Sequence, residues 1–76
     1  MARTAVRLSF SSETANDPVV YQMGQQFKVI TNIRHADVGE DSSGWLELDI
    51  EGDATAIEQA LEYCRSRGVR VERLNS

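Results

Sequence analysis

The sequence has few of the residues that bind metals or form cross-links: its 76 residues include one cysteine, Cys64, and one histidine, His35. A single cysteine forms no disulfide within the chain, and one cysteine with one histidine falls short of a closed structural zinc site. We therefore expect no metal site and no cofactor. The chain also has no glycine-rich phosphate-binding loop, which excludes a nucleotide-binding domain of the P-loop kind.

Long apolar runs are absent as well. No run approaches the roughly 18 residues that a membrane-spanning helix requires. The first four residues, Met-Ala-Arg-Thr, lead directly into an alternating pattern rather than into an apolar signal segment. We expect a soluble, cytoplasmic protein that does not insert into a membrane.

The middle of the chain lacks positive charge. Between Glu40 and Asp53 there are six acidic residues and no basic one, and the formal net charge of the chain is −4. Such a segment repels a phosphate backbone and cancels most of the electrostatic attraction that drives nucleic-acid binding. Nucleic acid is therefore not expected as a partner.

The residues that are present are those of an ordinary globular domain, with 41% apolar residues, and the length predicts a single domain over residues 1–76. Apolar periodicity predicts strands at 4–10, 28–38, 45–50 and 69–74, a helix from Asp17-Pro18 to about Gln26, and a second helix between Asp53 and Gly68. With right-handed crossovers, this βαββαβ order gives a four-stranded antiparallel sheet with both helices on one face. The expected fold is the ferredoxin-like α+β sandwich.

Two segments predict most of the core. The strict alternation of 45–50 places Leu46, Leu48 and Ile50 inside and Trp45, Glu47 and Asp49 outside. The second helix has an apolar stripe at helical spacing, made of Ile57, Ala60, Leu61 and Cys64. Asp17 and Asp53 stand where helix-capping side chains are found, and Gly68 stands where a left-handed residue ends a helix.

The strand at 28–38 mixes β-branched and polar residues, which is typical of an edge strand. We expect Val29 and Ile33 to face inward and Ile30, Asn32 and Arg34 to face outward. A bulge within 34–36 would reset that alternation.

Several functions of this fold are excluded by missing residues. Heavy-metal carriers need a Cys-x-x-Cys pair in the first loop, which here reads Ser-Ser-Glu-Thr. Phosphate-cradling hydrolases need a glycine-rich loop with an arginine after the first strand, and neither is present. RNA-binding sheets stack bases on aromatic residues of the central strands, whereas Trp45 here shares its outward face with Glu47 and Asp49.

The remaining chemically capable residues are best interpreted as structural. His35 and Asp37 are two polar side chains on a solvated edge rather than a catalytic pair. Cys64 is a small core residue rather than a reactive thiol. The basic residues near the C-terminus either carry positive charge that stabilises the C-terminal end of the second helix or lie on a solvent-exposed strand. They are Arg65, Arg67, Arg70 and Arg73.

The chain resembles the NIL domain, a ferredoxin-like module named for an Asn-Ile-Leu run. The matching features are Asn32-Ile33 after a β-rich lead-in, Ala36, the hairpin residue Gly44, the strand ending in Gly52, and the segment 68–72. The resemblance covers nearly the whole chain. It implies a small regulatory domain of the type found in the ATPase subunits of methionine-uptake ABC transporters and in ferredoxin-like proteins, which pairs with itself and binds methionine.

The resemblance also implies a ligand-binding site. Asn32 matches the asparagine associated with methionine binding, Ile33 is its core-facing neighbour, and Arg34 stands where the family has leucine. An asparagine amide can bond the amino or carboxylate group of an amino acid, and Arg34 adds charge complementarity to the carboxylate. The alternative is an asparagine in a β-bulge that serves its own backbone.

The leading hypothesis is thus a non-catalytic, self-associating ligand-binding or regulatory module. The alternative is a protein-interaction adaptor whose open sheet face docks a partner; a more distant one is a small enzyme using Asn32, Arg34 and His35. The expected homodimer brings an outward Trp45 next to Ile30 into a two-fold interface. There, Glu47 and Asp49 are expected to pair with Arg7, Arg34 or Arg70 across the axis.

Overall fold

The computed structural model describes residues 1–11, 18–39 and 43–74. Within these residues the chain forms four strands and two helices in the predicted order. They are β1 (Ala2–Phe10), α1 (Val19–Phe27), β2 (Ile30–Val38), β3 (Gly44–Gly52), α2 (Ala54–Ser66) and β4 (Arg70–Leu74). The strands make one antiparallel sheet in the order β2-β3-β1-β4. The ferredoxin-like α+β prediction is confirmed.

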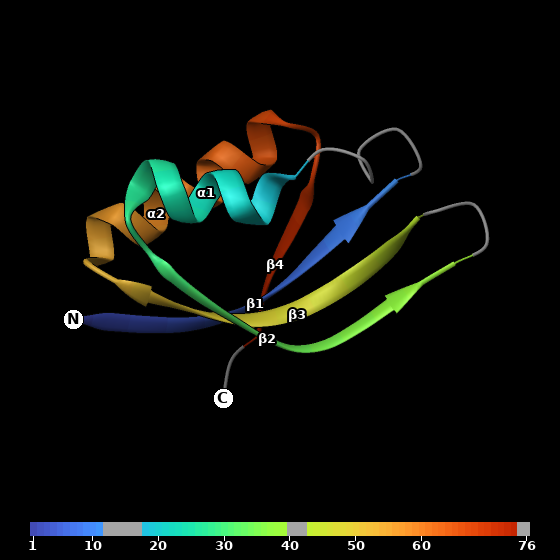
Figure 1. The fold of residues 1–76 in the computed structure, drawn as a ribbon, viewed down its shortest axis with the longest axis horizontal. Helices are drawn as coiled ribbons and strands as arrows, with labels where there is room; N and C mark the ends of the chain where they lie inside the picture. The colour runs from blue at the N-terminus through green and yellow to red at the C-terminus, as the bar shows by residue number, and fades with distance from the viewer. Residues whose placement is uncertain (12–17, 40–42, 75–76) are drawn as a thin grey trace.

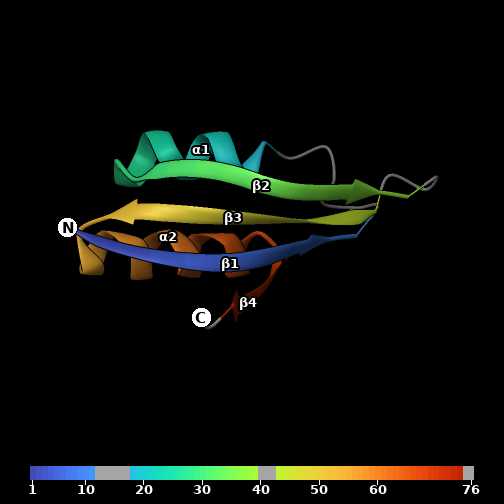
Figure 2. The same cartoon turned by 90° about the horizontal axis from the view of Figure 1, so that it is seen from below.

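Both helices cover the same face of this sheet, and the other face is open (Figures 1 and 2). The core fills the layer between them. It contains Val6 and Leu8 of β1, Val19 and Met23 of α1, Leu48 and Ile50 of β3, and the four-residue stripe of α2. Val29 and Val69, which directly precede β2 and β4, complete it. The predicted core positions of β3 and α2 are confirmed, with Leu46 partly buried at the edge of the core.

The start of β2 differs from the prediction because α1 ends differently. Lys28 adopts a left-handed backbone conformation with φ 57°, and its N–H donates to the carbonyl of Gly24 at 3.1 Å. This bond closes the last turn of α1, so Lys28 belongs to the helix cap and β2 begins at Ile30. The helix accordingly runs one residue past the predicted end at Gln26.

Both ends of α2 lie where the sequence predicts them, with Asp53 before the helix and Gly68 after it. Gly68 has φ 84°, a conformation that glycine adopts without a Cβ penalty, and β4 begins two residues later. Asp53 stands at the N-cap with an extended backbone, but its side chain makes no capping hydrogen bond. The expected cap at Asp17 and the hairpin residues 40–42 lie outside the described residues.

A register shift between Ile33 and His35 interrupts the pairing of β2 with β3. Arg34 is the extra residue, so the bulge lies inside the segment in which the sequence allowed one. On either side of it, Ile33 pairs with Leu48 and His35 with Glu47. Because paired residues of antiparallel strands share a face, Ile33 lies on the helix side and His35 on the open side.

Ile33 is nevertheless not buried. Its exposed fraction is 53%, and that of Val38, further along the same strand, is 72%. The ends of β2 and β3 that approach their connecting turn extend beyond the two helices (Figure 1). The inward direction predicted for Ile33 is therefore right for the face but wrong for burial, since β2 is an edge strand with no further strand on its outer side in the described sheet.

Candidate functional site

The open face of the sheet collects charged side chains of opposite sign from neighbouring strands. The register of β1 with β3 places Arg3 opposite Glu51 and Arg7 opposite Glu47. The register of β2 with β3 places Asn32 opposite Asp49. This face is the candidate site, because it presents polar groups that no helix covers (Figure 2).

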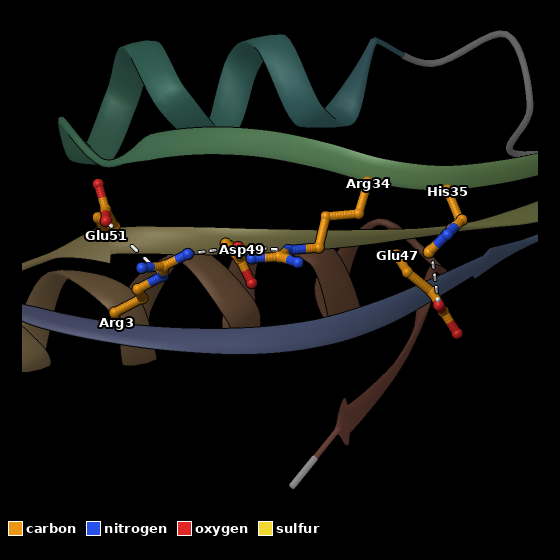
Figure 3. A network of polar contacts seen from close by, with 6 residues as sticks. All are labelled: Arg3, Arg34, His35, Glu47, Asp49 and Glu51. Carbon is orange, nitrogen blue, oxygen red and sulfur yellow. Dashed lines mark hydrogen bonds and ion pairs between the residues drawn. The ribbon is translucent and has the colours of Figure 1, made fainter. Parts of the chain in front are cut away.

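Asp49 lies at the centre of this face and is held by two arginines (Figure 3). Arg3 Nη2 donates to Asp49 Oδ2 at 2.9 Å, and Arg34 Nε donates to the same oxygen at 2.6 Å. The flanking side chains leave only 8% of the Asp49 side chain exposed. The hydrogen bond from Arg3, followed by that from Arg34, holds the pKa of the Asp49 carboxyl below its ordinary value. The hydrogen bond with Asp49 in turn raises the pKa of Arg3.

A second cluster lies nearer the hairpin, around Glu47. Arg7 donates from Nη2 and Nε to Glu47 Oε2 at 2.6 and 2.9 Å. His35 Nδ1 lies 3.5 Å from Glu47 Oε1 (Figure 3). The Arg7 guanidinium carbon also lies 4.8 Å from the centre of the Trp45 ring, within cation–π range. Arg7 of β1 thus contacts both Glu47 and Trp45 of β3.

The ion pairs of Glu47 and Asp49 differ from the pairs that the sequence predicted for these two residues. Glu47 and Asp49 were expected to find Arg7, Arg34 or Arg70 across a dimer axis, but Arg7 and Arg34 reach them within the same chain. The reason is the sheet order: β3 lies between β1 and β2, so the carboxylates of β3 have arginines on both sides.

The three predicted ligand-binding residues divide between the two faces. Asn32 and Arg34 lie on the open face, as predicted, with Asn32 exposed and directly opposite Asp49. Arg34 is the bulge residue, and its side chain is 54% exposed although its Nε bonds Asp49. Ile33 lies on the opposite face. The sheet therefore brings together Asn32, Arg34 and Asp49, and leaves Ile33 out of that group.

The two predicted interface residues lie far apart. Ile30 pairs with Glu51 and Trp45 pairs with Asp37, so they occupy opposite ends of β3 and its partner. Six residues of extended strand separate the two positions by about 20 Å. Ile30 is 58% exposed, whereas Trp45 is half-buried. The expected contact between them is wrong because the antiparallel hairpin pairs the start of β2 with the end of β3. Their role as interface residues stays a prediction.

Asp49 and Arg3 are the site residues that the sequence reasoning missed. Asp49 had been assigned an outward direction and an arginine partner across a dimer axis, and Arg3 no role. The available signal was the charge at some of the outward positions, which is positive at Arg3 and Arg7 of the first strand and negative at Glu47 and Asp49 of 45–50. Opposite charges on directly paired residues stabilise a sheet pair, so this pattern indicates that the two strands are neighbours.

Other candidate residues are engaged in the structure of α2 and the core. The Cys64 thiol lies in the core with its Sγ 3.5 Å from Met23 Sδ, and burial raises its pKa to about 11. Arg65 pairs with Glu62, and Arg73 pairs with Glu58. Across the described residues no three histidine, cysteine, aspartate or glutamate side chains gather as a metal-binding group. In the same part of the chain, neither helix is long and apolar enough to cross a membrane.

Comparison with known families identifies the module. Residues 4–73 match the model of the NIL domain. The chain belongs to the NIL domain family. This NIL domain is 35% identical over 68 residues to the methionine import ATP-binding protein MetN 2 of Acinetobacter baylyi, a match that covers 86% of the chain and 20% of the relative. It is 30% identical over 74 residues to the methionine import ATP-binding protein MetN 1 of Enterococcus faecalis, covering 93% and 21%.

A solved structure agrees in fold. The C-terminal domain of an ABC transporter ATP-binding protein from Enterococcus faecalis superposes with a TM-score of 0.85 and 25% identity, covering 96% of this chain and 84% of that one. The NIL domain described here spans about a fifth of the length of the curated relatives it matches. Family and neighbour support the role of a regulatory or ligand-binding module.

Proposed function

We propose that this NIL domain, spanning residues 1–76 as one unit, is a non-catalytic regulatory module that binds a small amino acid. The leading candidate for this ligand is methionine. We also propose that the domain associates with a second copy of itself. The observation that carries the proposal is family membership together with relatives that are named methionine import proteins. Methionine is an amino acid with a charged carboxylate and ammonium and an apolar side chain. A receptor for it needs polar groups beside apolar surface.

The open face supplies the polar part of such a receptor. Asn32 offers a carboxamide that both donates and accepts hydrogen bonds, which suits either charged group of an amino acid. Arg34 adds a guanidinium beside it, on a side chain that is 54% exposed and therefore reachable from solvent. Asp49 orients Arg34 by accepting its Nε–H at 2.6 Å. Ile30 is exposed on the same face, two residues before Asn32, and supplies the apolar surface of the receptor.

The proposal is tested by titrating the chain with L-methionine in a calorimeter and by measuring the melting temperature with and without the ligand. Binding to the folded state alone must raise the melting temperature by mass action. We expect Asn32→Ala to weaken binding at least tenfold while the folded spectrum is unchanged, because Asn32 is exposed and outside the core. The matched control is Gln59→Ala, which removes an exposed carboxamide from α2.

Two results would count against methionine binding. The first is a melting temperature that none of the twenty amino acids shifts at millimolar concentration. The second is equal affinity in the wild type, Asn32→Ala and Gln59→Ala. A chain that binds no amino acid and yet associates with itself would be an interaction module, as in the adaptor hypothesis.

A further inference from the structure

Two arginines on the open face share one hydrogen-bond acceptor. Arg3 Nη2 and Arg34 Nε lie 2.9 and 2.6 Å from the same atom, Asp49 Oδ2. The described residues give neither guanidinium a second acceptor within hydrogen-bond distance. Because a guanidinium carries five N–H donors, most donors of Arg3 and Arg34 are available to an acceptor from outside the chain.

Exposure decides which charge a ligand meets at this place. The Asp49 side chain is 8% exposed, whereas the side chains of Arg3 and Arg34 are 56% and 54% exposed. The surface over Asp49 therefore presents guanidinium groups to solvent (Figure 3). These three side chains hold two positive charges against one negative charge, in a chain whose net charge is −4.

We propose that Arg3 and Arg34 form a clamp for the carboxylate of a free α-amino acid, which bridges the two guanidiniums on the solvent side of Asp49. This inference rests on the proposed function and names the chemical class of its ligand: an amino acid whose α-carboxylate and α-ammonium are both unblocked. Since both guanidiniums bond one oxygen atom, they are close enough for a single carboxylate to reach both. Hydrogen bonds between ionised groups are short and roughly twice as strong as those between neutral groups.

Asp49 holds the arginine clamp together in the absence of a ligand. Arg34 is the bulge residue of β2, and a bulge turns a side chain away from the regular alternation of the strand. Arg3 comes from β1, on the other side of β3, so both strands that flank β3 contribute to the clamp. The hydrogen bonds from Arg3 and Arg34 lower the pKa of the Asp49 carboxyl, which therefore stays ionised at neutral pH. A clamp that is already assembled loses less conformational freedom when the ligand binds.

The ammonium group of the ligand has a partner beside the clamp. Glu51 Oε1 lies 3.7 Å from Arg3 Nε, and the Glu51 side chain is 42% exposed. Its carboxylate repels a simple anion that binds at Arg3, but it attracts the ammonium of an amino acid. Asn32, opposite Asp49, offers a further acceptor through its side-chain carbonyl. The charges around the clamp therefore favour an amino acid over a carboxylate without an ammonium group.

Arg7, on the same face, is engaged differently. It donates from both Nε and Nη2 to Glu47 Oε2, and its guanidinium carbon lies 4.8 Å from the centre of the Trp45 ring. Its side chain is 39% exposed, less than those of the two clamp arginines. One edge and one face of this guanidinium are thus occupied within the chain, so we place the ligand carboxylate at Arg3 and Arg34 rather than at Arg7.

Calorimetric titration with three forms of one ligand tests the ligand class. L-methionine is the first probe, because it is the leading candidate of the proposed function. L-methioninamide lacks the carboxylate, and N-acetyl-L-methionine lacks the ammonium. We expect each blocked form to bind about tenfold more weakly than L-methionine, because each loses hydrogen bonds to a charged group. Methioninamide that binds as tightly as L-methionine overturns the clamp.

Substitutions test which arginines hold the carboxylate. Arg3→Gln and Arg34→Gln should each raise the dissociation constant of L-methionine about tenfold. Arg34→Lys should recover only part of this loss, because lysine keeps the charge without the planar fork of donors. The matched control is Arg70→Gln, which removes an exposed arginine from the open face of β4 and should leave the affinity unchanged.

A measurement on the wild-type chain covers the case in which a variant does not fold. In NMR spectra, L-methionine should shift the Nε–H signals of Arg3 and Arg34 and leave that of Arg70 in place. Signals of Arg3 and Arg34 that stay unchanged while the ligand binds overturn the clamp.

The outcomes separate the clamp from the proposed function. Equal affinity of the wild type and both glutamine variants at Arg3 and Arg34 contradicts the clamp alone, and an equal loss in Arg70→Gln overturns it as an effect of net charge. A wild-type chain that binds no amino acid contradicts the proposed function and the clamp together. Binding of a different amino acid that both glutamine variants lose supports the clamp and contradicts methionine as the ligand.

Discussion

Leu48 and Asp49 are neighbours in β3 and meet opposite environments. Leu48 is 1% exposed beneath the helices, in a core of aliphatic side chains. Asp49 is also largely covered, but by two arginine side chains that are themselves more than half exposed, on a face that no helix covers. One face of the sheet therefore gains its stability from apolar burial. The other keeps polar groups within reach of solvent, where exposed ion pairs contribute little to stability.

The largest expected effect is on the helix-covered face. Leu48→Ala removes a fully buried side chain between the sheet and both helices, and should lower the free energy of unfolding by roughly 2–5 kcal/mol. Leu48→Met conserves volume and should cost less than about 1.5 kcal/mol. Chemical denaturation of both variants measures the difference. A loss below about 1 kcal/mol for Leu48→Ala would contradict the central place of this residue in the core.

Cys64 tests how completely the same layer excludes water. Burial raises the pKa of its thiol to about 11, so the thiolate fraction at pH 8 is about a hundredfold smaller than that of a thiol with a pKa of 9. We expect reaction with a thiol reagent to be slow in the folded chain and fast in denaturant. Equal rates in the two conditions would show that the core opens readily.

The ion pairs of Asp49 on the open face should make the free energy of unfolding depend on pH. The pKa of the Asp49 carboxyl is lowered in the folded chain, so the ionised form stabilises the fold above the unfolded pKa, near 3.8, and this stabilisation is lost as pH falls through the folded pKa. We expect Asp49→Asn to cost less than Leu48→Ala at pH 7. It should also flatten the loss of stability below about pH 4.

Glu51→Gln is the matched control for Asp49→Asn, because the Glu51 carboxylate lies 3.7 Å from Arg3 and is more exposed. Its unfolding free energy should follow the wild-type curve between pH 2 and pH 7 more closely. Identical pH profiles for Asp49→Asn and the wild type would show that the two arginines do not hold Asp49 ionised.

The smallest expected effect concerns Trp45. Arg7→Ala removes the guanidinium that lies over the ring and should shift tryptophan emission to the red, with a loss of about 0.5–1 kcal/mol for an exposed cation–π contact. Arg3→Ala, on the same strand, should leave the emission unchanged. Emission that is already red in the wild type would contradict the packing of Arg7 on Trp45.

The elements with a strong local period were determined by the sequence alone. The alternation of β3 and the stripe of α2 specify which residues are buried, because a one-residue slip would send every apolar side chain to solvent. Gly68 determined the end of α2 for an equally local reason, since its left-handed conformation suits a residue without a side chain. The outward direction of Asn32 and Arg34 also follows from alternation up to the bulge.

Only the tertiary structure decided how far that burial extends and which charges meet. Ile33 faces the helix side but remains 53% exposed on the edge strand β2, and nothing in its own neighbourhood of sequence reports how far the helices cover this edge. Arg3 and Asp49 are 46 residues apart in the chain and meet because β1 and β3 are adjacent. Period and propensity are properties of neighbouring residues, whereas the extent of a layer and the partner of a charge depend on which distant segments are packed together.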